Sequence, residues 1–436
     1  MLHLTAKKAG IIVSAAAATL AIFLPIATAN AAASHPDGST LPEFDSVGSD
    51  TIYCVDKAIY SAYSEKAVAV PPLGGENLGC TTTSLTQKVK KEISGTKFTF
   101  SSTGTTNCET TSNWNPTAAG DVLYPNGSGD GEECLANDNG RGNVAFSRSS
   151  SGKTASTLDA SSVDYWAFAL DAVTWSDFNG ATTAETGSVP NNNYAPKSLT
   201  PTQIADIYNC TYTNWMQVGG TNTPIVLDYP QSGSGTGSFF AKIFLNNVYP
   251  VSTMSCPINF VEENDGQLIN PNTDTAQATN EGVIYPYSFA LYTAQTNGTE
   301  TNVTNGDKLE AIQAVGQSKG YAPSATSITE PAAADNATSS GDACTDGTDT
   351  GKSFCSARYV YHVTDQALAT SFLSAYDSVL DFVGVPASGT APSTGICGNH
   401  FASTITTYGF KPLTKATTVQ GSPTDPVPGS SYCRQY

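Results

Sequence analysis

The pattern of apolar and polar positions along the chain predicts strands that alternate with helices. A short apolar strand, a turn of small polar residues and a helix follow one another in FDSVGSDTIYCVDKAIYSAYSEKA. The helix would place four residues on one apolar face, namely Ile52, Val55, Ile59 and Tyr63. The continuous apolar segment VDYWAFALDAVTW is typical of a buried strand, and SLTPTQIADIYNCTYTNW predicts a capped helix with Pro201 near its first turn. This alternation is typical of an α/β fold.

Four predicted strands end in loops that are rich in serine, threonine and glycine. The segments are SVGSDTIY, KFTFSSTGTTNCET, GNVAFSRSSSGKTAS with a strand ending at Phe146, and LDYPQSGSGTGSFFAKIF, which leads directly into an apolar helix. Ligands bind at the carboxyl ends of strands in open α/β sheets, and unpaired N–H groups at the start of a helix favour an anion. Any one such loop would be an ordinary turn. Four of them at equivalent positions predict a shared binding site.

The charges in these loops indicate how the ligand is held. Arg148 is the one candidate cation and Asp50 the one carboxylate. Because hydroxyl and N–H groups dominate, we expect a polyoxygen anion held by many short hydrogen bonds rather than by a cluster of cations.

The composition excludes two classes of partner. Asp and Glu outnumber Lys and Arg by 38 to 20, which gives a net charge of −18. Nucleic acids and anionic membranes require a basic surface, so neither is expected as a partner. A small anion is not excluded, because it responds to nearby N–H dipoles more than to distant surface charge.

The start of the chain is typical of a signal peptide. Lys7 and Lys8 precede an apolar run and the small-residue stretch ATANAAAS. We expect residues 1–31 to be removed and residues 32–43 to form a flexible lead-in, with an N-terminal membrane anchor as the alternative. The first cysteine is Cys54, so the lipid-attachment cysteine of a bacterial lipoprotein is missing. A secreted or extracytoplasmic protein is predicted.

Ten cysteines follow the predicted signal peptide. They are Cys54, Cys80, Cys108, Cys134, Cys210, Cys256, Cys344, Cys355, Cys397 and Cys433. An even number in an exported chain, without the spacing of a zinc site, predicts five disulfides. Pairing between neighbours is the simplest arrangement, although the sequence leaves the connectivity open.

Several of these segments together resemble the solute-binding proteins of phosphate ABC importers, the PstS-like branch of the type II periplasmic-binding-protein fold. LTPTQIADIYNCTYTNW is similar to the family's LT-x-x-Q-(I/L)-x-x-I-(F/Y) helix with TNW, and PIVLDYPQSGSGTGSFF to its P-I-x-x-x-x-R-x-D-x-SGT loop. NEGVIYPYSFALY resembles the G-x-IGY-x-x-x-x-Y strand, and SVGSDTIY and FSSTGTT resemble the first two ligand loops. The likeness runs from about Phe44 to Leu413. It implies two α/β lobes, joined by two crossovers, that close over one anion.

The loop residues and the resemblance together give a set of candidate ligand residues. The set is Ser49, Asp50, Thr51, Ser102, Thr103, Arg148, Ser149, Ser150, Gln231, Ser234, Gly235 and Thr236. Two positions depart from the family pattern: its ligand Asp falls on Ser150, and its ligand Arg falls on Pro230 or Gln231. Arg148 can restore the positive charge, since a guanidinium is well shaped for an oxyanion.

The lost Asp bears on ligand selectivity. In the family this carboxylate accepts a hydrogen bond from an anion that carries a proton, and so separates hydrogen phosphate from sulfate. Asp50 can supply that acceptor here. Without it, the site would take another oxyanion or a phosphorylated organic ligand.

The resemblance predicts an extracytoplasmic solute-binding protein that takes phosphate to an ABC permease. We expect lobe I to comprise residues 44–165 and 361–436, and lobe II residues 166–360. The protein would be a monomer that needs no cofactor and catalyses no reaction. A freely secreted scavenger, or an interaction protein with a vestigial cleft, is the alternative.

A secreted hydrolase is the alternative from another class. His362 and His400 are its candidate bases, and nothing in the sequence places a serine beside either one. The acidic segments GSGDGEEC and GDACTDGTDTGK miss the pattern of an EF-hand, so we expect solvated disulfide loops rather than calcium sites. Three tryptophans are predicted to pack in the core rather than to line a sugar site, namely Trp166, Trp175 and Trp215.

Overall fold

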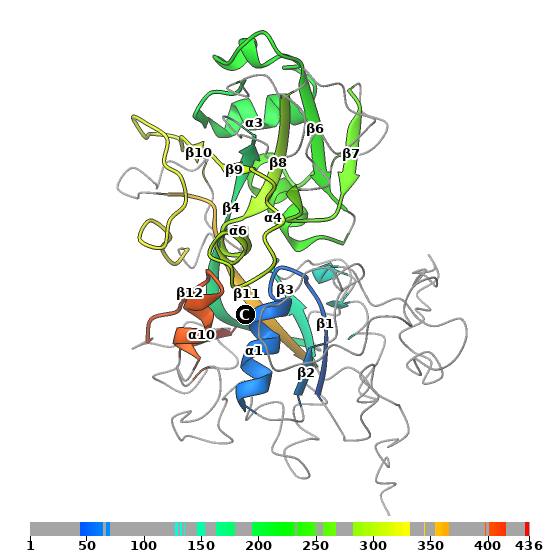
Figure 1. Cartoon of the computed structure of the whole chain (residues 1–436), viewed down its shortest axis with the longest axis vertical. Helices are drawn as coiled ribbons and strands as arrows, with labels where there is room; N and C mark the ends of the chain where they lie inside the picture. The colour runs from blue at the N-terminus through cyan, green and yellow to red at the C-terminus, as the bar shows by residue number, and fades with distance from the viewer. Residues whose placement is uncertain are drawn as a thin grey trace, which may run out of the picture.

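The computed structural model describes residues 44–63, 67–69, 127–129, 131–132, 135, 146–152, 163–178, 194–231, 233–248, 250, 256–266, 282–331, 344, 354–365, 397, 401–415 and 432–435. The predicted signal peptide and lead-in lie outside these residues, as do Ser102, Thr103 and His400. The elements are labelled as in Figure 1: β1 (Phe44–Gly48), α1 (Tyr53–Tyr63), β2 (Ala67–Ala69), β3 (Phe146–Ser149), β4 (Val163–Asp177), β5 (Ser198–Leu199), α3 (Pro201–Tyr208), the 3₁₀ helix η5 (Trp215–Val218), β6 (Ile225–Pro230), α4 (Gly235–Phe244), β7 (Ile258–Val261), β8 (Gly282–Ser288), α6 (Phe289–Thr296), β9 (Lys308–Leu309), β10 (Ala311–Ile312), β11 (Ala357–Asp365), α10 (Ala402–Thr407), β12 (Lys411–Pro412) and β13 (Arg434–Gln435).

Two groups of strands at opposite ends of the long axis form two lobes (Figure 1). In one lobe, β1 pairs in parallel with β2 and β3. In the other lobe, β6 pairs in parallel with β7 and β8. Helices α1 and α10 accompany the first group, and α3 and α4 the second. This arrangement confirms the two-lobed α/β fold predicted from the sequence.

The long strands β4 and β11 connect the two lobes. β4 pairs antiparallel with β11 as far as Ala172 and with β8 from Val173 onwards. The strand order is therefore continuous across the molecule, β2-β1-β3-β11-β4-β8-β6-β7. The predicted lobe limits at 165 and 361 fall within these two strands, and the register of β11 shifts between Val360 and Tyr361.

The faces predicted to be apolar form the core. β4 is buried along almost its whole length, as its continuous apolar run indicated. The described side chains of the predicted α1 face, those of Ile52, Val55 and Ile59, are buried. The predicted core tryptophans are at most 4% exposed, which confirms their packing role: Trp166, Trp175 and Trp215.

Helix α3 begins where the sequence predicted. Pro201 is its first residue, and Thr200 caps it. The Thr200 hydroxyl accepts a hydrogen bond from the Gln203 N–H at 3.2 Å, and the Gln203 side chain accepts one from the Thr200 N–H at 2.9 Å. This reciprocal capping satisfies two N–H groups that the helix itself leaves unpaired.

The third predicted loop begins later than expected. The sequence predicted that the strand ends at Phe146, but β3 continues to Ser149. Ser147 pairs with Val47 on one side and with Val363 on the other. Pairing with two neighbouring strands overrides the weak strand preference of serine, so Ser147, Arg148 and Ser149 belong to a central strand.

Three disulfides join cysteines that are neighbours in the sequence. They are Cys210–Cys256, Cys344–Cys355 and Cys397–Cys433. Cys54 is also disulfide-bonded, and no cysteine in the described part of the chain is free. These three pairs have the neighbour pairing that was the simplest arrangement, and the remaining cysteines Cys80, Cys108 and Cys134 lie outside the described residues.

Two kinds of feature are missing from the residues that the structure describes. No helix among them combines the length and apolar character that a membrane span needs. Nor do three His, Cys, Asp or Glu side chains among them gather into a group that could hold a metal ion.

Candidate functional site

Strand ends from both lobes meet between the lobes. β1 leads into α1, and β6 leads into α4, so that the first turns of both helices lie at this boundary. The hydroxyl oxygens of Thr51 and Thr236 are 3.4 Å apart, and both side chains are buried. The positive dipole ends of two helices make this boundary favourable for an anion.

The residues Ser234, Gly235 and Thr236 start α4, and we call them the α4 cradle. Ser234 caps the helix, because its hydroxyl accepts from the backbone N–H three residues further on at 3.0 Å. Gly235 has no space for a side chain: an added Cβ would lie 2.2 Å from the Ser128 Oγ and 2.3 Å from the Ser150 Oγ. The serines of the opposite lobe therefore close directly onto the cradle.

A carboxylate of the protein itself, that of Glu263, occupies the α4 cradle. Its Oε2 accepts hydrogen bonds from the Ser234 hydroxyl and from the Thr236 N–H, the latter at 3.1 Å. Its Oε1 accepts from the Thr51 hydroxyl of the other lobe at 3.4 Å. Burial raises the pKa of this carboxyl to about 7, although the attraction of Arg358 and the Thr236 hydrogen bond lower it.

Gln231 braces the segment that carries Glu263. Its side-chain oxygen accepts from the Glu263 N–H at 2.8 Å, and its amide nitrogen donates to the Glu262 carboxylate at 3.2 Å. Gln231 was predicted to be a ligand residue. The structure places its amide against the loop after β7.

The buried guanidinium of Arg358 contacts the α4 cradle from β11. Its Nη2 donates to the Thr236 hydroxyl at 3.0 Å. Nε and Nη2 both donate to the Asp171 carboxylate on β4, at 3.0 and 2.8 Å, and both side chains are fully buried. The remaining nitrogen, Nη1, is buried and makes no hydrogen bond to any described residue. Arg358 therefore keeps one donor that can serve a ligand.

The guanidinium of Arg148, the cation predicted from the sequence, holds the loop before α1. Its Nη1 donates to the Ser46 carbonyl at 2.5 Å, its Nη2 to Gly48 at 3.1 Å and its Nε to Ser49 at 3.2 Å. It also lies over the Tyr53 ring, 5.3 Å from the centroid. These contacts fix the backbone at the start of α1.

A chain of serine hydroxyls lines the lobe I side of the boundary. The Ser49 hydroxyl donates to the Ser150 Oγ at 3.0 Å, and the Ser150 Oγ lies 3.2 Å from the Ser128 Oγ. The Ser150 N–H donates to the Ser128 Oγ at 2.9 Å. Ser149 instead donates to Glu132 at 2.5 Å.

The expectation of a solvated loop at GSGDGEEC was wrong for its described residues. Ser128 and Glu132 are at most 1% exposed, because this segment folds against the boundary between the lobes. Burial raises the pKa of the Glu132 carboxyl to about 7, while hydrogen bonds from Ser149 and Tyr165 lower it. A loop of small polar and acidic residues has the same sequence pattern whether it is solvated or buried, and only the tertiary packing decides between the two.

Asp50 presents a carboxylate oxygen at the start of α1. Its Oδ1 accepts from the Thr51 N–H at 2.7 Å. Its Oδ2 is buried and accepts no hydrogen bond from any described residue. Since Asp50 is only 1% exposed, this oxygen is an acceptor that a ligand with a proton can satisfy.

His362, a candidate base for a hydrolase, lies in the lobe I core. Its Nε2 is 2.9 Å from an Asp56 carboxylate oxygen, and its ring stacks on Phe168 with centroids 4.4 Å apart. The edge of Phe146 covers it as well, and the histidine is fully buried. This environment is typical of a structural histidine.

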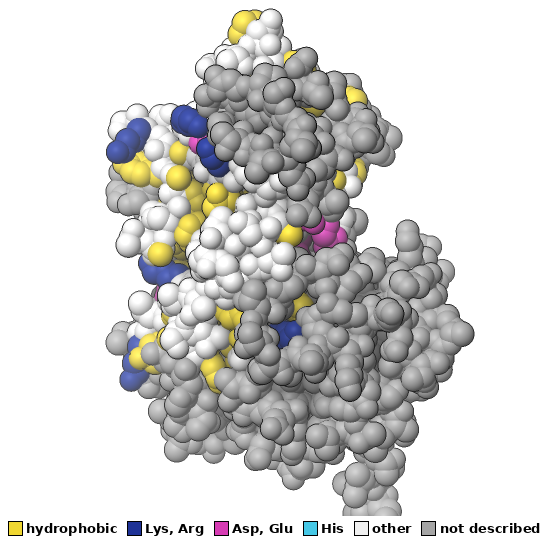
Figure 2. All heavy atoms as spheres, viewed as in Figure 1, with side chains coloured by type: hydrophobic (Ala, Val, Ile, Leu, Met, Phe, Trp, Pro, Cys, Tyr) yellow, Lys and Arg dark blue, Asp and Glu magenta, His cyan; other side chains and the backbone are white. Residues whose placement is uncertain are grey.

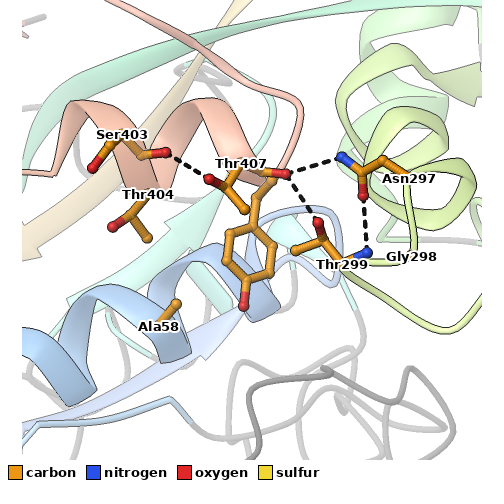
Figure 3. Close-up of a pocket in the computed structure, with 8 residues that line it drawn as sticks. Ala58, Asn297, Gly298, Thr299, Ser403, Thr404 and Thr407 are labelled. Atoms are coloured by element: carbon orange, nitrogen blue, oxygen red, sulfur yellow. Dashed lines mark hydrogen bonds between the residues drawn. The ribbon is translucent and has the colours of Figure 1, made fainter.

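Two features of the described surface bear on anion binding. Acidic side chains gather at one edge of the waist between the lobes (Figure 2). A hollow of about 520 Å³ lies among α1, the turn after α6 and α10 (Figure 3), lined by Ala58, Asn297, Gly298, Thr299, Ser403, Thr404, Thr407 and Tyr408. Asn297 and Thr299 both donate to the Thr407 carbonyl there, at 3.1 and 3.2 Å. No lining residue of this hollow carries a charge.

Comparison with known proteins assigns the chain to a family. A family model described as a PBP superfamily domain matches residues 83–374. The chain belongs to the PBP superfamily. No curated protein matches it significantly.

Solved structures similar to this member of the PBP superfamily include three proteins named for phosphate binding or transport. The putative phosphate ABC transporter substrate-binding protein of Clostridium perfringens, with bound phosphate, is 13% identical, with 85% of this chain and all of that chain covered and a TM-score of 0.41. A high-affinity periplasmic phosphate-binding protein bound with phosphate is 14% identical. The match covers 85% of this chain and 90% of that chain, with a TM-score of 0.46. The ABC-type phosphate transport receptor of Vibrio cholerae is 16% identical. The match covers 67% of this chain and 88% of that chain, with a TM-score of 0.37. The assignment to the PBP superfamily rests on the family model.

Sequence reasoning missed the most informative members of the site. They are Ser128, Glu263 and Arg358, together with Asn264, whose side-chain amide donates to the Thr51 hydroxyl at 3.3 Å. An arginine inside the apolar strand sequence ARYVYHV was a usable signal, because a buried charge requires a partner. The acidic pair in VEEND follows a strand end, as the predicted ligand loops do.

Proposed function

We propose that this protein binds inorganic phosphate, as the monohydrogen anion, between its two lobes. Arg358 would donate to an unprotonated phosphate oxygen, and Asp50 would accept the phosphate proton. The start of α4, together with Thr51 and Ser150, would supply further donors.

The observation that carries the proposal is a pair of buried, unsatisfied groups of opposite kind. Arg358 presents the donor Nη1 and Asp50 presents the acceptor Oδ2, each without a hydrogen bond to any described residue. Their neighbours Thr236 and Thr51 have hydroxyl oxygens only 3.4 Å apart, which puts both groups at one boundary. Monohydrogen phosphate offers both an acceptor oxygen and a donor hydroxyl, whereas sulfate near neutral pH offers only acceptors.

The proposed mechanism is binding by closure of the lobes. Contacts such as that between Thr51 and Thr236 join residues on opposite sides of the boundary, and an anion that adds more contacts of this kind favours the closed state. β4 and β11 are the segments about which the lobes would move, since β4 pairs with β8 of one lobe and β11 pairs both with β4 and with β3 of the other lobe. Delivery of phosphate to an ABC permease, by a monomer exported with its predicted signal peptide, completes the proposal.

Calorimetric titration of the desalted mature protein with phosphate and sulfate tests this function. We expect saturable binding of phosphate and little heat from sulfate. If another oxyanion gives heat of binding and phosphate gives none, that oxyanion is the ligand instead of phosphate. If no anion gives heat, an interaction protein with a vestigial cleft is favoured.

Replacement of Asp50 with asparagine tests the basis of selectivity. The asparagine oxygen can still accept the Thr51 N–H, but its amide nitrogen replaces the acceptor Oδ2 with a donor. We expect Asp50→Asn to bind sulfate and to lose its preference for phosphate by roughly tenfold or more, since a buried mismatched hydrogen bond costs about 1–3 kcal/mol. A variant that keeps the preference of the original protein would assign the proton acceptor to another group.

A further inference from the structure

Glu263 gives the α4 cradle an anion of its own. The Ser234 hydroxyl and the Thr236 N–H, the donors proposed for an external anion, both donate to the Glu263 carboxylate. The Thr51 hydroxyl reaches the same carboxylate from the opposite lobe. A carboxylate held by the cap and first N–H groups of a helix resembles a bound oxyanion in its hydrogen bonds.

The backbone around Glu263 is fixed, so this carboxylate is not easily withdrawn. The Glu263 N–H donates to Gln231, and the Tyr285 hydroxyl donates to the Glu262 carbonyl at 2.7 Å. Asn264 accepts from the Tyr287 hydroxyl and the Gln295 side chain through its carbonyl, at 2.6 and 2.9 Å. With its neighbours held on both sides, the Glu263 side chain stays beside the cradle.

Two anions at one cradle repel each other strongly in a buried site. A second anion is accommodated at low cost if the resident carboxyl gains a proton, because the neutral group then donates a hydrogen bond to its new neighbour. We propose that Glu263 is an internal counter-anion of the cleft, and that inorganic phosphate enters the α4 cradle together with the uptake of one proton by this carboxyl. This inference rests on the proposed function, and it makes phosphate affinity depend on pH through a residue of the protein.

The charges around Glu263 favour this role. Arg358 of β11 attracts its carboxylate, and Asp171 of β4 neutralises that same arginine. Among the described residues, the other titratable groups around it are Tyr285 of β8, Asp50 beside Thr51, and the nearby Glu262 and Asp265, and none of these four adds a positive charge. The burial that raises the pKa of the Glu263 carboxyl to about 7 makes proton uptake accessible near neutral pH. A nearby phosphate anion would raise this pKa further.

Calorimetry with inorganic phosphate near pH 8 in two buffers of different ionisation enthalpy measures the protons taken up. Phosphate is mostly the dianion there, so the ligand contributes equally to every protein compared. We expect the original protein to take up about one proton more per phosphate than Glu263→Gln. Between about pH 7 and pH 9, the ratio of the phosphate affinity of the original protein to that of Glu263→Gln should fall by about tenfold per pH unit.

Glu262→Gln is the matched control. Its carboxylate accepts from the Gln231 amide, whereas the Ser234 and Thr236 donors of the α4 cradle go to Glu263, so this variant should keep the proton uptake of the original protein. Equal proton uptake in the original protein and in Glu263→Gln, with phosphate bound by both, would overturn the inference and leave the proposed function intact. Failure of both proteins to bind phosphate at any pH would instead reject the proposed function.

The test does not depend on a single variant. Circular dichroism establishes whether Glu263→Gln folds. If it does not, proton uptake by the original protein decides the question, since an uptake near zero throughout about pH 7–9 contradicts the inference.

Discussion

At the scale of single residues, the proposed site depends on a few buried polar groups whose partners come from distant parts of the chain. Arg358 and Asp171 are directly opposite each other on β11 and β4, and Asp171 also accepts from the Ser288 hydroxyl at 2.8 Å and the Ala290 N–H at 2.9 Å. A guanidinium held this firmly loses little entropy when it binds an anion. The strength of anion binding should therefore depend strongly on Arg358.

Replacement of Arg358 with methionine should weaken phosphate binding by roughly ten- to hundredfold. The reason is the loss of a charged hydrogen bond donor, which contributes about 1.5–3 kcal/mol. Isothermal titration with phosphate measures the change.

Arg148→Met is the matched comparison, because Arg148 is equally buried but its guanidinium donates to backbone carbonyls. We expect its main effect on the melting temperature, through the loop before α1. A larger loss of affinity in Arg148→Met than in Arg358→Met would restore Arg148 as the cationic ligand.

At the scale of elements, the start of α4 fits against two loops of the other lobe. Gly127 and Gly129 lie against Gly233, and the Gly129 N–H donates to the Gly233 carbonyl at 3.1 Å. The serines at 128 and 150 fill the space above Gly235. A side chain at position 235 would therefore displace these serines from the closed contact.

Replacement of Gly235 with alanine should lower phosphate affinity by at least tenfold and leave the melting temperature of the ligand-free protein nearly unchanged. The added Cβ would lie 2.2 Å from the Ser128 Oγ and 2.3 Å from the Ser150 Oγ, so both serines would have to shift before the lobes could close. Titration calorimetry and thermal unfolding measure the two effects.

Gly129→Ala provides the control, since its Cβ would meet the Gly233 backbone at an ordinary 3.7 Å. This variant should bind as the original protein does. If Gly235→Ala binds equally well, the anion does not need the closed contact seen between the lobes.

At the scale of the whole molecule, several carboxyl groups are buried. Burial raises the pKa values of Glu132 and Glu263 to about 7, and those of Glu300 and Asp307 well above their ordinary values. A carboxyl whose pKa is higher in the folded than in the unfolded state stabilises the fold fully below its unfolded pKa. This contribution is lost as the pH rises through the folded value.

The melting temperature should therefore be higher near pH 5 than near pH 8. Glu132 and Glu263 would each contribute roughly 3 kcal/mol to this difference, from the pH window between about 4.5 and 7. Thermal unfolding followed by circular dichroism measures it, and Glu263→Gln should reduce it. A melting temperature that rises from pH 5 to pH 8 would show that burial does not raise the pKa values of these carboxyl groups in the folded protein.

The sequence by itself determined the features that depend on neighbouring residues. The alternation of strands and helices, the cap of α3 at Thr200 and the loop that starts α4 all follow from local patterns. Helix starts and buried strands can be read from the chain because their causes, namely capping side chains and apolar runs, lie within a few residues.

Only the tertiary structure decided which charges meet at the boundary between the lobes. Arg358 reaches Thr236 across 122 positions, and Thr51 reaches Glu263 across 212. No local pattern indicates such contacts, because they depend on the order of strands in the sheet and on how the lobes close. Burial then sets the protonation of Glu263 and commits Arg148 to backbone carbonyls, and burial is a property of the folded chain.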